Sequence, residues 1–260
     1  MGATTSGTRA VSWARTAVLL GSALLVACRA IPAEREAAAD SASPSVIRRV
    51  AGSSVEGREI PYSVHGSGSV TVLLLAGIHG NEAAGTPLLE RLEEELEAGR
   101  CADWLADRRL VVVPRANPDG LTSRRRHNAR GVDLNRNFPS RNFSGRERHG
   151  AAPLSEPESR ALHELVLRFD PDRALSFHMP VGIIDYDGPA EALARAVGAA
   201  GPLPVQRLGS RPGSLGSWFG VDLGRPILTV EQPGSDRVLD ADELWERYAP
   251  MLRAAILFGD

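Results

Sequence analysis

The chain has 260 residues, of which 43% are hydrophobic and 24% charged, and its formal net charge is -2. This length suits one large α/β domain with a sizeable core, and the apolar content is that of a globular protein. The near balance of 30 Lys and Arg residues against 32 Asp and Glu residues gives no bulk electrostatic reason to expect nucleic acid as a partner.

An export signal is predicted at the N-terminus. Arg9 and Arg15 precede an apolar segment, residues 17–27, which is too short to span a bilayer comfortably and ends in small residues. Residues 1–27 are therefore interpreted as a signal peptide.

The signal ends in "LVAC", Leu25 to Cys28, which resembles a bacterial lipobox. The resemblance implies cleavage before Cys28 and lipidation of its thiol, which would anchor the domain to a membrane without a spanning helix. Arg29 stands where an Asp would indicate retention in the inner membrane. The implied location is thus the periplasmic face of the cell envelope, at the outer membrane in an organism that has one. The alternatives are an ordinary signal peptide and an uncleaved anchor that happens to contain Cys.

A tether is predicted between the signal and the folded domain. Residues 28–45 are rich in Ala, Ser, Pro and charged residues and show no apolar periodicity. We expect the folded domain to span residues 46–260.

Short apolar runs bounded by turn residues predict strands, and amphipathic segments between them predict helices. The predicted strands are Glu59–Val64, Val70–Ala76, Arg109–Pro114, Arg173–Phe177 and Pro226–Glu231. The predicted helices are Thr86–Ala98, Glu156–Phe169, Pro189–Ala200 and Ala241–Phe258. Strands that alternate with helices predict an α/β fold of three layers, α/β/α, with a mixed, largely parallel twisted sheet.

Potential metal ligands stand where three of these strands end. His79 and Glu82 follow the first long apolar run, His178 follows "RALSF", and Glu231 closes "PILTVE". Ligands of such sheets bind beyond the carboxyl ends of the strands. Two imidazoles and a carboxylate form the ligand set of hydrolytic zinc sites, and a further, unligated carboxylate can take a proton from water. The alternative for the isolated H-x-x-E pair is a surface His beside a helix-starting Glu, but the glycines of "AGIHGNEAAG" let the backbone approach a ligand closely.

Five motifs occur in the order found in one enzyme family. "GIHGNE", "NPDG" (Asn117–Gly120), "RRRHNARGVDLNRNFP" (Arg124–Pro139), "SFH" and "TVEQP" together resemble the zinc metallocarboxypeptidases of family M14. "GVDLNRNFP", the proline of "HMP" and "PGSLGSW" (Pro212–Trp218) resemble the murein peptide amidase A branch, the γ-D-glutamyl-meso-diaminopimelate peptidases. The match spans nearly the whole domain and implies a zinc carboxypeptidase-like fold.

The resemblance divides the roles at the strand ends. It implies that His79, Glu82 and His178 hold one Zn²⁺ ion. It implies that Glu231 is the general base, which later hands the proton to the leaving amine.

The resemblance also assigns an arginine to the scissile carbonyl. Arg126, shortly before "NARGVDLNR", would polarise that carbonyl, because a fixed cation stabilises charge that develops in the transition state. Arg124 and Arg125 are read as residues of a solvated loop, although the motif leaves open that one of them takes this role. Asp133 is interpreted as structural, bracing the loop or supporting a ligand.

By the same resemblance, Asn135 and Arg136 grip the terminal carboxylate of the substrate, which the planar fork of an arginine fits. The alternative is that both residues cap a turn. The implied reaction is hydrolysis of the bond between γ-D-Glu and meso-diaminopimelate in anionic, wall-derived peptides, by a monomer held at the membrane through Cys28. The competing functions are a general carboxypeptidase releasing L-amino acids, an amidoacylase of the desuccinylase kind, and a non-catalytic lipoprotein that binds peptidoglycan.

One feature departs from the digestive-type members of the family. They carry a mobile tyrosine before the general base, and residues 201–229 contain none. Either that group is dispensable, or Trp218 or a backbone amide of "PGSLGSW" lines the substrate side in its place.

Overall fold

The structure is a computed structural model that describes residues 46–259. The predicted signal peptide, the tether and Cys28 lie outside the described residues, so export and lipidation stay predictions. The strands are β1 (Ile47–Ser53), β2 (Glu59–His65), β3 (Val70–Leu75), β4 (Arg108–Val113), β5 (Arg173–His178), β6 (Ile183–Asp187) and β7 (Ile227–Glu231). The α-helices are α1 (Gly85–Glu97), α2 (Pro118–Ser123), α3 (Pro157–Phe169), α4 (Glu191–Ala199) and α5 (Ala241–Ile256).

The strands of the described residues form one seven-stranded sheet in the order β1-β2-β4-β3-β5-β7-β6. The four central strands, β4, β3, β5 and β7, pair in parallel. On one side of them β2 pairs antiparallel with β4 and the edge strand β1 pairs antiparallel with β2, and on the other side the edge strand β6 pairs antiparallel with β7. The central strand β3 is buried on both faces, which explains its nearly continuous apolar sequence, "VTVLLL". Its residues Leu73 and Leu75 belong to one core cluster, and Val72 and Leu74 to the other.

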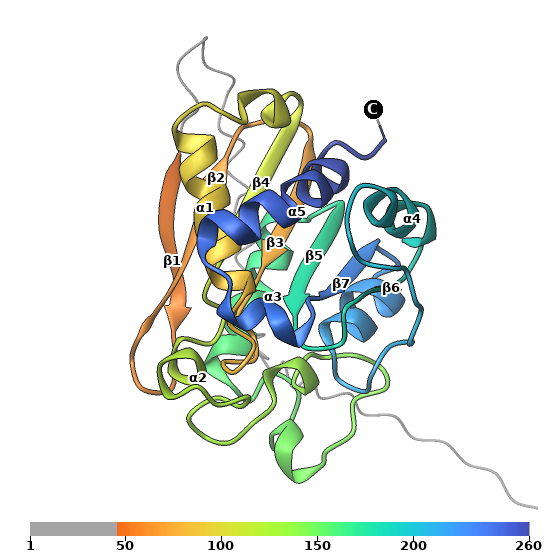
Figure 1. The fold of residues 1–260 in the computed structure, drawn as a ribbon. Coiled ribbons are helices and arrows are strands. Elements are labelled where there is room, and N and C mark those ends of the chain that lie inside the picture. The colour runs from red at the N-terminus through yellow and green to blue at the C-terminus, as the bar shows by residue number, and fades with distance from the viewer. Residues whose placement is uncertain (1–45, 260) are drawn as a thin grey trace, which may run out of the picture. The chain divides into compact units, whose positions relative to one another are not determined.

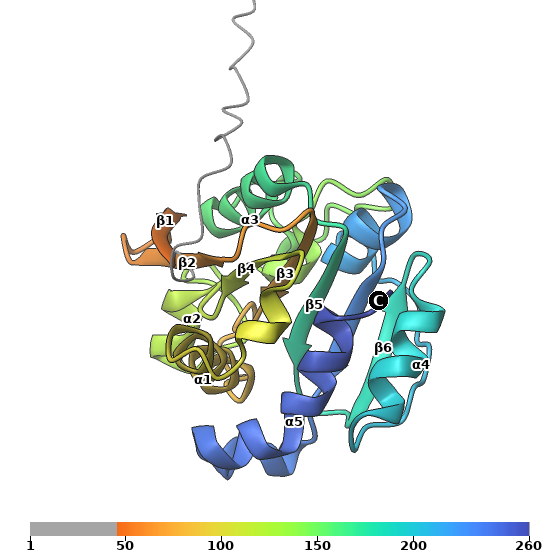
Figure 2. The same ribbon diagram turned by 90° about the horizontal axis from the view of Figure 1, so that it is seen from above.

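Helices cover both faces of the sheet, which confirms the three-layer prediction. Figure 2 shows α3 on one side of the sheet and α1 and α5 on the other. The core on the α1 side includes Leu88 and Tyr248, and the core on the α3 side includes Leu162 and Phe138. None of the helices in residues 46–259 is long and apolar enough to cross a membrane.

The predicted strands and helices are all present, with ends within two residues of those expected. The sequence analysis did not predict β1, α2 or β6. β1 lies at an edge and is largely exposed, so it lacks the apolar run of a buried strand. β6, "IIDYD", carries two aspartates, which are depleted in strands.

The carboxyl ends of the parallel strands meet at one edge of the sheet. The long segment between α2 and α3 lies on the side toward which the arrow of β5 points (Figure 1). This segment contains the motif from Arg124 to Pro139, so the fold brings the arginine-rich motif to the same edge as the predicted metal ligands.

Candidate metal centre

The H-x-x-E pair lies on a tight turn directly after β3. The backbone N–H of Glu82 donates to the carbonyl oxygen of His79 at 3.1 Å. Gly80, inside the turn, lies so close to the backbone of Gly120 that a Cβ atom would clash with it. The glycine therefore permits a close approach of the turn to α2, and both ligating side chains face the same side.

Three buried side chains converge at this turn. Nδ1 of His79 and Nδ1 of His178 each lie 2.9 Å from Oε2 of Glu82. The two Nδ1 atoms are 3.2 Å apart, and one potential ligand atom of each residue lies within 4.8 Å of the others. Two imidazole nitrogens and a carboxylate oxygen around one point are the donor set that zinc takes in hydrolytic enzymes. The residues present therefore fit the metal that the sequence predicted.

The glutamate of this cluster is held in its ionised form. Burial opposes ionisation, but hydrogen bonds from His178 and His79 bring the pKa of Glu82 well below its usual value. A carboxylate that remains charged at neutral pH can ligate a cation without first losing a proton.

The outward-facing nitrogens of both imidazoles also have partners. Nε2 of His79 lies 3.0 Å from Oδ1 of Asp133, and Nε2 of His178 lies 2.9 Å from Oγ of Ser176. Such partners fix the ring orientation and the tautomer, so that Nδ1 is left to face the metal. Asp133 thus has the supporting position expected of it. The sequence analysis missed Ser176, although alternation along β5 puts it on the same face as His178.

Replacing Asp133 with asparagine is expected to weaken zinc binding by about 10–100-fold. Asparagine keeps the shape of the side chain but removes the negative charge that holds the Nε2 proton of His79. Competition with a chromophoric chelator measures the affinity. Asp242→Asn, on the exposed first turn of α5, is the matched control, and an unchanged affinity in Asp133→Asn would contradict this supporting role.

Glu231 lies beside the cluster. In the parallel pairing of β5 and β7, Glu231 is the register partner of His178. Its Oε2 atom is buried and has no hydrogen-bond partner among the described residues, and burial raises the pKa of its carboxyl group. A carboxylate with one unpartnered oxygen, next to a histidine that could hold a metal, fits the further, unligated carboxylate expected from the sequence.

Arg126 is the arginine of its triplet that reaches the centre. Its Nη1 donates to Oε1 of Glu82 at 2.8 Å, and its Nε donates to Oδ2 of Asp133 at 3.0 Å. Arg124 and Arg125 are exposed, because Arg124 ends α2 in the left-handed conformation with φ 54° and the chain turns after it. The structure therefore favours Arg126 over its two neighbours for a role at the metal.

Asn135 and Arg136 lie in a short 3₁₀-helix, η2 (Leu134–Arg136). Oδ1 of Asn135 accepts a hydrogen bond from the backbone N–H of Leu215 at 2.9 Å, which leaves its Nδ2 group for a ligand. Arg136 is half-buried and forms no ion pair within residues 46–259; its Nη1 donates to the carbonyl oxygen of Asn135. Burial lowers the pKa of the Arg136 guanidinium. A desolvated cation without a carboxylate partner is suited to bind an anion.

Trp218 does not take the place of the missing tyrosine. It lies in a π-helix, η4 (Gly216–Asp222), and is only 5% exposed. Its ring stacks on Phe138, with centroids 5.8 Å apart, and contacts the ring of His163. Trp218 is therefore a core residue, and the expectation that its ring lines the substrate side is wrong.

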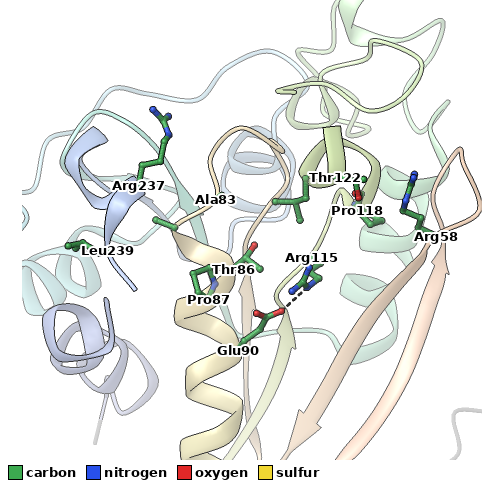
Figure 3. Close-up of a pocket in the computed structure, with 12 residues that line it drawn as sticks. Arg58, Ala83, Thr86, Pro87, Glu90, Arg115, Pro118, Thr122, Arg237 and Leu239 are labelled. Atoms are coloured by element: carbon green, nitrogen blue, oxygen red, sulfur yellow. Dashed lines mark hydrogen bonds and ion pairs between the residues drawn. The ribbon is translucent and has the colours of Figure 1, made fainter. Parts of the chain in front are cut away.

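A cavity of about 570 Å³ lies next to this centre but does not contain it. Figure 3 shows Thr86 and Pro87 of α1 on one side of it and Thr122 of α2 on another, with an ion pair between Arg115 and Glu90. None of His79, Glu82 and His178 lines this cavity. It therefore does not add a residue to the metal site.

The sequence profile described as zinc carboxypeptidase, family M14, matches residues 36–186, more than half of the chain. The chain belongs to the zinc carboxypeptidase family. Curated relatives include murein peptide amidase A of Escherichia coli K12, which is 36% identical over 194 residues, covering 68% of this chain and 75% of the relative. The catalytic chain of human carboxypeptidase N is 32% identical over 149 residues, covering 43% of this chain and 32% of the relative.

Solved structures share the fold. The murein-tripeptide amidase of Escherichia coli O157 superposes with a TM-score of 0.62 at 29% identity, covering 82% of this chain and 93% of that one. Bovine thrombin-activatable fibrinolysis inhibitor superposes with a TM-score of 0.70 at 19% identity, covering 81% of this chain and 88% of that one, and at this identity it shows the fold alone. The protein is therefore a hydrolase of the zinc metallopeptidase class, with a mixed α/β fold of the zinc carboxypeptidase kind.

Proposed function

We propose that this zinc peptidase hydrolyses the bond between γ-D-Glu and meso-diaminopimelate in murein-derived peptides. The convergence of His79, Glu82 and His178 beside the unpartnered Oε2 of Glu231 is the observation that carries the hydrolytic chemistry. The similarity to murein peptide amidase A over 68% of the chain supports the choice of bond. The guanidinium of Arg136, which forms no ion pair within residues 46–259, supports an anionic substrate.

Each proposed role follows from the position of the side chain. Bound zinc would acidify water and polarise the scissile carbonyl. Glu231 would accept a proton from the attacking water at its unpartnered oxygen and then donate it to the leaving amine. Arg126, which already contacts Glu82, would donate hydrogen bonds to the carbonyl oxygen as negative charge develops there. Arg136 and the Nδ2 group of Asn135 would hold the terminal carboxylate of the substrate.

Mass spectrometry of the products from L-Ala-γ-D-Glu-meso-diaminopimelate tests the proposal. We expect release of free meso-diaminopimelate, loss of this release with a chelator, and its return with added Zn²⁺. Blocked dipeptides ending in ordinary L-amino acids are the comparison substrates. Faster release from the dipeptides would favour a general carboxypeptidase, and no release from any substrate would favour the non-catalytic alternative.

The arrangement of the site argues against a non-catalytic binding protein. A site that has lost its activity is expected to lack at least one of the residues that bind the metal, accept the proton or bind the substrate. The chain keeps both histidines and Glu82, and it keeps Arg136 and Glu231 at positions where they can act.

A further inference from the structure

The chain concentrates positive charge in one segment. Residues 124–149 contain eight arginines and two acidic residues, whereas the formal net charge of the whole chain is -2. The rest of the chain is therefore negatively charged, and the cations are gathered in the segment that the fold brings to the edge of the metal centre. Such a distribution attracts anions to one part of a molecule.

The eight arginines differ in their partners. Arg126 contacts Glu82, and Arg136 is half-buried. Arg130 lies 3.6 Å from the carboxylate of the buried Glu156. The other five arginines are exposed: Arg124, Arg125, Arg141, Arg146 and Arg148. Within residues 46–259, Arg141 is the one of these five that comes near an acid, with its Nε atom 4.0 Å from a carboxylate oxygen of Asp222.

Three of the exposed arginines, Arg141, Arg146 and Arg148, lie on the loop between η2 and α3, and we call them the arginine surface. The side chain of Arg141 is 86% exposed. Arg146 and Arg148 flank the exposed Glu147, which is the one acidic residue in residues 141–149. Three cations around one acid leave this surface with a net positive charge.

The path of this loop does not depend on the arginine side chains. Asn137 is fully buried, and its Nδ2 donates to the carbonyl oxygens of His149 and Ala152 at 2.7 and 3.0 Å. Its Oδ1 accepts from the backbone N–H of Glu156 at 3.1 Å. The buried asparagine therefore fixes the loop from inside, and the arginine surface is free to bind a partner without a cost to the fold.

The arginine surface lies toward one end of the sheet. The backbone N–H of Arg141 donates to Asp222 of η4 at 2.6 Å, and η4 packs on β6 and β7. The described part of the chain enters the domain at the other end, through the edge strand β1, which lies five strand spacings or about 24 Å from β7 (Figure 1). An anchor before β1 would thus be attached far from the arginine surface, which favours a partner other than the anchoring membrane.

The proposed substrate belongs to a polymer with the complementary charge. A bond to the γ-carboxyl group of D-Glu leaves the α-carboxylate of that residue free, and meso-diaminopimelate adds two carboxyl groups and one free amino group. Each stem peptide of this kind is therefore anionic, and murein repeats it along the glycan chains. Arg136 accounts for the terminal carboxylate of one stem peptide, so the arginine surface is left for carboxylates of others.

We propose that the arginine surface binds the carboxylates of neighbouring stem peptides in polymeric murein, so that the enzyme docks on the polymer while its metal centre acts on one stem. The choice of polymer rests on the proposed function. Exposed cations at the rim of a site chiefly speed the encounter with an anionic partner and make it sensitive to salt. The enzyme is therefore expected to act on insoluble murein as well as on released peptides.

Co-sedimentation with insoluble murein whose stem peptides end in meso-diaminopimelate tests the inference. The zinc-loaded protein carries Glu231→Gln, so that the polymer stays intact. Replacing Arg141, Arg146 and Arg148 together with glutamine is expected to weaken binding about 10-fold, the scale of three exposed ion pairs. The difference should disappear in about 1 M salt, and murein whose carboxyl groups have been converted to methylamides should not distinguish the variants.

The matched control replaces Arg49, Arg195 and Arg253 with glutamine. These residues are exposed on β1, α4 and α5, and the control variant has the same net charge as the arginine-surface variant. It should bind murein as the unsubstituted surface does. Equal binding by the two variants, or no binding of murein by the protein with its arginine surface intact, would overturn the inference.

Vesicles separate murein from a membrane as the partner. Phosphatidylglycerol vesicles are compared with phosphatidylcholine vesicles, so that a lipid anchor contributes equally to both. If the arginine-surface variant lost a preference for phosphatidylglycerol but bound murein normally, the surface would dock on membranes and the inference would be wrong.

Activity distinguishes this inference from the proposed function. In the background with Glu231 intact, the arginine-surface variant should release meso-diaminopimelate from subsaturating insoluble murein about 10-fold more slowly than the wild type. Its kcat/KM for soluble L-Ala-γ-D-Glu-meso-diaminopimelate should stay that of the wild type, which also shows that the variant is folded. Equal rates on insoluble murein would overturn the inference while the proposed function stands. If the wild type cleaved neither substrate, the proposed function would fail, and the co-sedimentation result would still decide the docking.

Discussion

Replacing Glu231 with glutamine is expected to lower kcat by about 10³–10⁴-fold, the upper part of the range for general acid–base catalysis. Glutamine has nearly the same shape, but its amide cannot accept the proton of the attacking water. Zinc binding should persist, because the converging ligand atoms belong to His79, Glu82 and His178. Steady-state kinetics and metal analysis of the same preparation measure both quantities.

The control for this variant is Glu164→Gln, since Glu164 is exposed on α3. It should keep the kcat and the zinc content of the wild type. Near-normal turnover in Glu231→Gln would refute the assigned base. Loss of zinc from that variant would show instead that Glu231 is a metal ligand.

Replacing Arg136 with alanine is expected to raise KM for peptides with a free terminal carboxylate by about 10²–10³-fold. The guanidinium is half-buried, desolvated and free of any ion pair within residues 46–259, so its attraction for a carboxylate is little screened. Arg136→Lys should recover only part of the loss, because an ammonium group cannot bind a carboxylate through two parallel hydrogen bonds. The exposed Arg125 provides the control variant, Arg125→Ala.

A substrate with a C-terminal amide separates carboxylate binding from a general effect on the site. The wild type should bind the amide much more weakly than the free acid, whereas Arg136→Ala should bind the two about equally. A penalty for the amide that is as large in Arg136→Ala as in the wild type would place the carboxylate-binding group elsewhere.

Much of the fold could be predicted because the central strands are continuous apolar runs. β3 and β4 are buried on both faces, so their residue types alone indicate strands. β6 was missed because Asp185 and Asp187 interrupt its apolar character, and strand propensity cannot recognise an acid that a glycine backbone accommodates. β1 was missed because an edge strand has few buried positions.

The candidate site could be predicted in part, because its metal ligands stand in motifs at strand ends. His178 is far from His79 and Glu82 in sequence, yet the parallel pairing of β3 and β5 brings the three residues together. The motif could not decide among the three consecutive arginines, since that choice depends on the left-handed turn at Arg124. Trp218 was considered for the substrate side because aromatic residues can serve either in a core or at a ligand, and only its stacking on Phe138 decides between the two.

The contact between Gly216 and Asp187 sets a rule for related sequences. Because a methyl group at position 216 would occupy the place of the carboxylate oxygen Oδ2, a relative with alanine there is expected either to turn this carboxylate away or to lack an acid at position 187. The two positions should therefore covary, although 28 residues separate them along the chain. An alignment of many relatives would show whether the residues at these two positions change together. The residues found there would then sort the relatives into subgroups.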